Sequence, residues 1–211
     1  MASTKFAVPL LAALSAFAQA PVPGLRIEPT AGGSIFYIHN GYSQPLTAYL
    51  IELVDYPGSS YALWTDDPAN PIAAGGDQRI QVANMTVGAV PDYVKMQAAI
   101  FADGSTAGVP AKVALLVGRR KAVLATTREL IRRCEKGTDK AALSADLRQW
   151  AESMPPIARA NRNSQAAIDQ GAAQGLINQT IRSLEAQSID EVLGKLRASE
   201  KLLAASKPLL P

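Results

Sequence analysis

Residues 98–121 read AAIFADGSTAGVPAKVALLVGRRK and contain the change from strand to helix that decides the fold. The first part, up to Phe101, is an apolar run of the kind found in a buried strand. Asp103-Gly104 then predicts a tight turn, in which Asp103 bonds the backbone and the glycine supplies a positive φ. Pro110 suits the first turn of a helix, and no further proline occurs before residue 136. The stretch therefore predicts strands before residue 108 and helices after it.

The half before this stretch has the composition of a β domain. Short segments rich in β-branched and aromatic residues alternate with glycine, proline and asparagine turns, which is typical of an antiparallel sandwich. The segment 46–56 is apolar at odd and even positions, so we expect it to be covered on both faces. Trp64 is expected to pack in the sandwich core rather than to line a sugar-binding platform. The expected strands cover 34–39, 46–56, 60–65, 79–83 and 93–101.

The half after this stretch has a helical pattern. Apolar residues recur every three or four positions from residue 113 to 134, and Arg120 and Thr127 interrupt the stripe that they form. Gly137 suits the end of this helix, and Thr138 suits the start of a second one. A proline pair at 155–156 ends the second helix.

Two further helices are expected in the remaining sequence. Asn161 or Asn163 can start the third helix, and Ser188 with Glu191 matches a capping box that starts the fourth. The fold class is therefore α+β. We predict an immunoglobulin-like β-sandwich at 21–108, without the disulfide of antibody domains, followed by a helical hairpin or small bundle at 109–211.

The strand, turn and helix at 98–121, with Arg119-Arg120-Lys121 on the helix, resemble a class of uncharacterised exported bacterial proteins. In that class a small β-sandwich ends in such a strand and passes into a basic helix. The resemblance covers residues 35 to 125. The class carries no assigned activity, so the resemblance implies an architecture and no site residues.

The first twenty residues have the parts of a cleavable secretory signal peptide. One lysine, Lys5, precedes an apolar segment at 6–18, and Ala18-Gln19-Ala20 is the small-x-small pattern that signal peptidase accepts. The apolar segment is shorter than the roughly 20 residues of a membrane-spanning helix. We expect a periplasmic or secreted protein, cleaved after Ala20, with no transmembrane segment in the mature chain. The alternative is a buried N-terminal helix.

Cys134 is the only cysteine of the chain. A single cysteine excludes an internal disulfide and a zinc site built on cysteine pairs. As a nucleophile Cys134 would need a nearby histidine, and His39 is the only one in the sequence. The pattern around Cys134 predicts instead a small, buried side chain on a helix face.

Charge is distributed unevenly along the chain. Residues 21–108 contain three basic and eight acidic side chains, whereas residues 109–211 contain seventeen basic and ten acidic ones. Part of the basic excess forms a stripe on the helix at 110–136, which could bind anionic lipid headgroups, cell-wall polyanions or nucleic acid. Export and the lack of interleaved aromatic residues argue against nucleic acid. The alternative is a solvated face that docks in part on the acidic β domain. The basic stripe consists of Lys121, Arg128, Arg132 and Lys136.

Two groups of polar side chains are candidates for chemistry. His39 with Asp66 and Asp67 could serve a hydrolase of envelope polymers, although no Gly-x-Ser-x-Gly elbow is present. The carboxylates of Asp66, Asp67 and Asp77 could hold Ca²⁺ if their loops meet, whereas the loop at Asp103 lacks the other ligands of an EF-hand. Turns explain these aspartates more simply. We therefore assign no catalytic residue, no metal ligand and no cofactor.

The sequence favours a non-enzymatic binding or assembly module of the cell envelope over an enzyme. The expected partner is an anionic envelope component or a protein. One alternative is the hydrolase at His39, Asp66 and Asp67, which requires these polar groups to meet in one cleft. Another alternative is a structural protein whose helices extend away from the β domain and self-associate.

Overall fold

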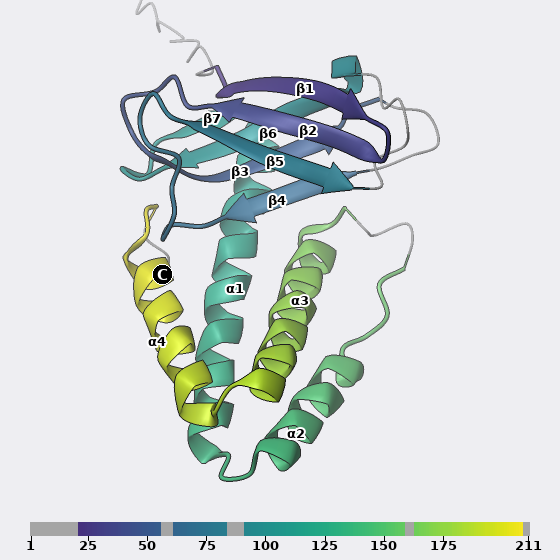
Figure 1. Cartoon of the computed structure of the whole chain (residues 1–211), viewed down its shortest axis with the longest axis vertical. Coiled ribbons are helices and arrows are strands. Elements are labelled where there is room, and N and C mark those ends of the chain that lie inside the picture. Colours follow the sequence, from purple (N-terminus) through teal and green to yellow (C-terminus); the bar gives the residue numbers. More distant parts are fainter. Residues whose placement is uncertain (1–20, 56–60, 84–90, 159–162, 209–211) are drawn as a thin grey trace, which may run out of the picture.

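The computed structural model describes residues 21–55, 61–83, 91–158 and 163–208. The expected signal peptide at 1–20 lies outside the described residues, as does the candidate helix start at Asn161. Two antiparallel sheets come first in the chain and helices follow, which confirms the α+β class (Figure 1).

The strands form two sheets, which lie together at one end of the molecule (Figure 1). One sheet has the order β1-β2-β5 and the other has the order β4-β3-β6-β7, with antiparallel neighbours throughout. The expected strands are present with shifted ends, and β1 and β7 are additional strands that the sequence analysis did not mark. The bounds are β1 (Gly24–Thr30), β2 (Gly33–His39), β3 (Leu46–Leu53), β4 (Ala62–Asp66), β5 (Asp77–Ala83), β6 (Val94–Phe101) and β7 (Thr106–Gly108).

Strand β3 is covered on both faces, as its apolar odd and even positions predict. Tyr49 and Ile51 belong to the core between the two sheets, where they pack with Phe36 and Phe101 among others. Ala48, on the opposite face of β3, belongs to a second cluster that α1 (Pro110–Lys136) completes. A strand buried on both faces fixes the register of its sheet, because a slip by one residue would exchange the two sets.

Helix α1 starts on the outer face of the four-stranded sheet and then extends beyond it (Figure 1). Leu116 is fully buried there, with Val113 and Val117 packed beside it. Trp64 packs against this same cluster, so it lies between the sheet and the helix rather than inside the sandwich. One helix thereby joins the sandwich to the helical half of the chain.

The helices run alternately away from the sandwich and back towards it (Figure 1). α2 (Lys140–Ser153) returns part of the way, α3 (Gln165–Ala186) runs away again, and α4 (Ile189–Ala205) brings the chain end back to the sheets. The three later helices share a core with the distal part of α1, and Cys134 is buried in it as predicted. No helix in the described part of the chain has both the length and the hydropathy of a membrane-spanning segment.

At the junction between α1 and α2, the end of α1 agrees with the prediction, but the residue that caps α2 differs from the predicted one. α1 ends at Lys136 and Gly137 follows it as predicted. Asp139, not Thr138, caps α2, because its carboxylate accepts a hydrogen bond from the backbone N–H of Ala142. An aspartate is at least as good a cap as a threonine, and its charge also favours the positive end of the helix dipole.

The later helix starts were predicted with mixed success. Ser164 caps α3 through its hydroxyl, so the predicted start at Asn163 is wrong by one residue. The capping box of Ser188 and Glu191 is present at the start of α4, with both reciprocal hydrogen bonds formed.

Candidate binding site

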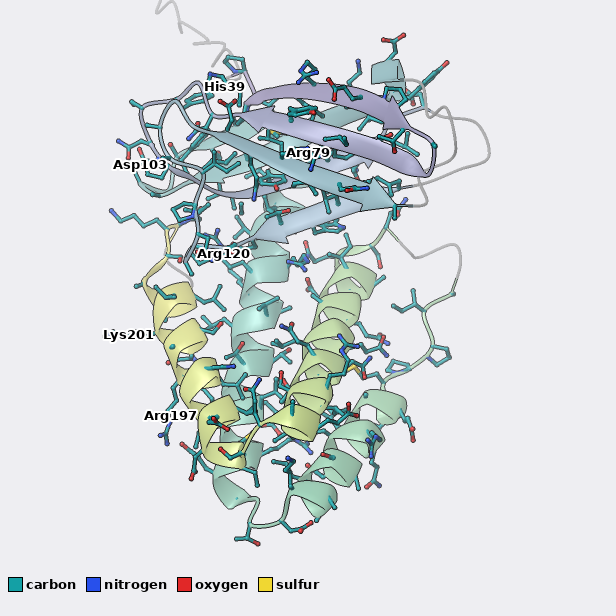
Figure 2. All side chains as sticks on the ribbon, viewed as in Figure 1. His39, Arg79, Asp103, Arg120, Arg197 and Lys201 are labelled. Atoms are coloured by element: carbon teal, nitrogen blue, oxygen red, sulfur yellow. The ribbon has the colours of Figure 1, made fainter. Side chains whose placement is uncertain are left out.

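Arg120, which interrupts the apolar stripe of α1, lies at the junction of the sandwich and the helices (Figure 2). Its side chain is 0 % exposed, and that of Asp66 at the end of β4 is 4 % exposed. The guanidinium donates through Nη2 to Oδ1 of Asp66 at 2.7 Å and through Nε to Oδ2 at 2.9 Å. This fork satisfies both carboxylate oxygens at once, which is the strongest geometry for such a pair.

The same guanidinium reaches two further segments of the chain. Its Nη1 donates to the carbonyl oxygen of Lys207 at 2.7 Å, directly after α4. Its Nη2 also lies 3.3 Å from Oγ1 of Thr47 in β3, whose hydroxyl donates to the carbonyl of Ile100 in β6. Arg120 thus connects α1, β3, β4 and the end of α4, which are far apart in sequence.

The uneven charge distribution of the sequence is complementary across this junction. Lys112, near the start of α1, forms a second ion pair with Glu52 of β3, with 2.7 Å between Nζ and Oε2. The basic helix therefore docks on the acidic β half through Lys112 and Arg120, neither of which belongs to the basic stripe.

A pocket of about 350 Å³ opens beside Arg120, between α1 and α3. This volume falls in the range of small-molecule sites. We call it the junction pocket. Its walls include Asp66 of β4, Arg119 and Val123 of α1, and Gly171, Gly175, Leu176 and Gln179 of α3.

Among the residues that the structure describes, Arg119 is the one cationic side chain that lines the junction pocket. It is partly buried, and within the described residues no hydrogen bond or ion pair satisfies its guanidinium. Burial lowers the pKa of Arg119, and the negative charges of Asp66 and Asp169 oppose this shift. Because Asp66 is already held by Arg120, the guanidinium of Arg119 retains free donors facing the pocket.

Two glycines on the α3 wall leave open space in the pocket, because they have no side chain. A Cβ at Gly171 or Gly175 would have no atom within 4 Å. Gly118 of α1 is different, because a Cβ there would come within 2.3 Å of Nε2 of Gln165. Close packing of α1 and α3 thus accounts for Gly118 and does not account for the two pocket glycines. A glycine inside a helix lowers the stability of the helix by about 1 kcal/mol relative to alanine, so the open space at these two positions reduces stability.

The basic stripe predicted on α1 is partly neutralised by its own chain. Arg128 pairs with Glu200 of α4, with 3.0 Å between Nε and Oε1, and Arg132 pairs with Glu129 on α1. Lys121 and Lys136 are exposed and form no ion pair among the described residues. The stripe therefore offers two free charges rather than four.

The residues considered for hydrolysis lie apart. His39 ends β2 and is exposed, and its Nδ1 lies 3.0 Å from Oδ1 of Asp77. Asp66 is committed to Arg120, and Oδ1 of Asp67 accepts from the backbone N–H groups of Ala69 and Asn70. Figure 2 shows His39 on the side of the sandwich away from the helices and Arg120 on the side next to them.

The aspartates considered for calcium have structural roles. Oδ1 of Asp103 accepts from the backbone N–H and the hydroxyl of Ser105, and Gly104 has a φ of +90°, which confirms the predicted turn. A Cβ at Gly104 would also come within 2.9 Å of the side chain of Lys207. Within the described residues, no group of three or more histidine, cysteine, aspartate or glutamate side chains could hold a metal ion.

Comparisons with known proteins supply no identity for the chain. No family model, no curated protein and no solved structure matches it. The resemblance to exported bacterial proteins with a basic helix stays a prediction.

The junction pocket could not be predicted from the sequence, although the sequence contains one signal for it. Arg120 interrupts the apolar stripe of α1, and a buried arginine requires a buried acceptor. The acidic half of the chain had to provide that acceptor, and Asp66 was one of its eight acidic residues. Arg119 carried no separate signal, since its exposure depends on how α3 packs.

Proposed function

We propose that the mature chain is an exported, non-enzymatic binding or assembly module of the cell envelope, and that the junction pocket is its ligand site. The observation that carries this proposal is which charged side chains of the pocket are already paired within the chain and which are not. Arg119 has free donors there, whereas the carboxylate of Asp66 is held in a fork by Arg120. Such a site can attract a ligand without presenting a free carboxylate as general base.

An immunoglobulin-like assignment of the sandwich belongs to this proposal. The sheets β1-β2-β5 and β4-β3-β6-β7 match the constant-type order, with the fourth strand placed beside the third instead of in the first sheet. Sandwiches of this kind occur in many extracellular binding proteins, which supports a binding role by analogy only.

The export part of the proposal rests on residues 1–20, which have the parts of a cleavable signal peptide. We expect a bacterial host to process the full chain after Ala20, so that intact mass of the periplasmic fraction gives a protein that begins at Pro21. A chain that retains Met1 and stays in the cytoplasm would contradict export.

Binding at the pocket can be tested by hydrogen exchange. The mature chain is measured with and without the small-molecule fraction of a bacterial envelope extract. We expect slower exchange in the pocket walls, at 119–123 of α1 and 171–179 of α3. Protection that is absent, that lies only elsewhere, or that is accompanied by conversion of a component of the extract would contradict a non-enzymatic site at the junction.

The basic stripe gives a separate route to an anionic envelope partner. Because Arg128 and Arg132 are ion-paired, Lys121 and Lys136 should carry most of any binding to purified peptidoglycan at low salt. We expect the double substitution Lys121→Gln and Lys136→Gln to remove such binding, and Lys95→Gln on the sandwich to leave it unchanged. Equal binding by all three proteins would contradict a role for the stripe.

A further inference from the structure

We infer that the junction pocket binds a small organic monocarboxylate, with the carboxylate on the guanidinium of Arg119 and the apolar part of the ligand against α3. This inference rests on the proposed binding function and names the ligand class of the same site.

The guanidinium of Arg119 is a cation without a bonded acceptor among the described residues. Arg119 is partly removed from water, and no acceptor among the described residues replaces the lost hydration. A planar guanidinium binds a carboxylate through two parallel N–H donors, and such charge-assisted bonds are about twice as strong as neutral ones. A bound carboxylate would therefore supply the acceptor that the fold withholds.

The charges around the junction pocket favour a ligand with a single negative charge. Asp66 lines the pocket and Asp169 lies close enough to act on Arg119. Both carboxylates would repel a dianion such as inorganic phosphate, and they would repel a monoanion less strongly. The carboxylate class is thus preferred over phosphate.

The shape and lining of the junction pocket suit a ligand with a short apolar part. Val123 and Leu176 provide apolar surface beside the guanidinium, and Gln179 adds a polar amide. The volume of about 350 Å³ is at the low end of the range for small-molecule sites, so it suits a ligand with a short apolar chain. The open space above Gly171 and Gly175 provides that room.

The probe for the test is hexanoate, added to the mature chain labelled with ¹⁵N. We expect the Nε–Hε signal of Arg119 and the amide signals of Gly171 and Gly175 to shift saturably, with a Kd on the order of 1 mM for so small a ligand. Hexanol, which has the same chain without the charge, should cause no saturable shift of the Arg119 signal. Inorganic phosphate should bind more weakly than hexanoate.

Two substitutions test separately the charge of Arg119 and the open space at Gly175. Arg119→Gln should weaken hexanoate binding about tenfold or more, measured at the glycine amides, because the charge-assisted bonds are lost. Gly175→Leu should abolish binding by filling the pocket, while the helix gains propensity and stays folded. Gly194→Leu is the matched control, because Gly194 is also inside a helix with open space and does not line the pocket.

The inference is overturned if hexanoate causes no saturable shift in the wild-type chain, or if Arg119→Gln or Gly175→Leu binds it as the wild type does. Tighter binding of phosphate than of hexanoate would also overturn it. Failure here leaves the proposed function separately testable: protection of the pocket walls by envelope extract would then show a ligand of another class, whereas no protection would contradict both.

Discussion

At the scale of single residues, Arg120 connects α1 to β3, to β4 and to the residue Lys207 after α4. A buried ion pair is seldom a net source of stability, because removing two charges from water costs about as much as their attraction returns. The pair of Arg120 and Asp66 instead destabilises other positions of α1 on the sheet, because a position in which Arg120 did not reach Asp66 would bury an unpaired charge. The pair therefore specifies how α1 lies on the sheet.

Breaking this pair from one side should be costly. We expect Asp66→Asn to lower the free energy of unfolding by about 3 kcal/mol, because Arg120 would stay buried without its counter-ion. Arg120→Met should be similarly destabilising, since it also leaves the carbonyl of Lys207 without its donor. The measurement is urea unfolding of the mature chain.

The double variant and an exposed arginine provide the controls for this prediction. Arg120→Met combined with Asp66→Leu should cost clearly less than the two single changes added together. Arg79→Met, at an exposed position of β5, should change stability by no more than about 0.5 kcal/mol. Additive effects at the junction would show that the two side chains do not act as a pair.

Glu129 gives a pH-dependent prediction at the same scale. The hydrogen bond from Arg132 is the main cause that lowers the pKa of Glu129 to about 2, and Arg133 contributes as well. A carboxyl group whose pKa is lower in the folded than in the unfolded chain stabilises the fold when the pH is above the pKa of the unfolded chain. For Glu129 this stabilisation is lost as the pH falls from about 4.5 to about 2. We expect the carboxyl NMR signal of Glu129 to titrate near pH 2, and to titrate higher in Arg132→Gln. A midpoint near 4.5 in the wild-type chain would contradict the ion pair.

At the scale of elements, the residue Lys207 after α4 contacts both α1 and the sandwich. Arg120 binds the carbonyl of Lys207, and the side chain of Lys207 lies against the turn at Gly104. The start of α4 is fixed by the capping box of Ser188 and Glu191. The helix is thus held at both ends, and its middle packs on α1.

The capping box can be tested by one substitution. Ser188→Ala removes the hydroxyl that accepts from the backbone N–H of Glu191, and we expect a loss of about 1 kcal/mol in thermal or urea unfolding. Ser199→Ala, in the interior of the same helix, is the control and should be neutral within about 0.5 kcal/mol. Equal effects of the two changes would mean that the box does not stabilise α4.

Local sequence signals predicted the elements better than their contacts. Pro110 and Gly137 gave the bounds of α1, Ser188 gave the start of α4, and the two-sided apolar pattern of β3 gave its burial. β7 was missed because a three-residue strand has too little periodicity to register. The pocket was missed because Arg119 and Gly175 are far apart in sequence, and only the packing of α3 on α1 brings them together.

At the scale of the whole molecule, the acidic sandwich and the basic helical half form one charge-complementary body. Lys112 and Arg120 each connect α1 to a different strand of the four-stranded sheet. The junction pocket exists only while this docking holds, because its walls come from both halves. We therefore claim that the sandwich and the helices unfold as a single cooperative unit.

The two tryptophans allow this claim to be tested directly. Trp64 lies between the sheet and α1, whereas Trp150 packs on the distal helical core. In the variant Trp150→Phe, fluorescence reports Trp64 alone, and far-ultraviolet circular dichroism reports mainly the helices. Urea unfolding of this mature variant followed by both signals should give one shared midpoint, and adding Asp66→Asn should lower both signals' midpoint together. Loss of the helical signal at a lower urea concentration than the Trp64 transition would show two independent units and contradict the account.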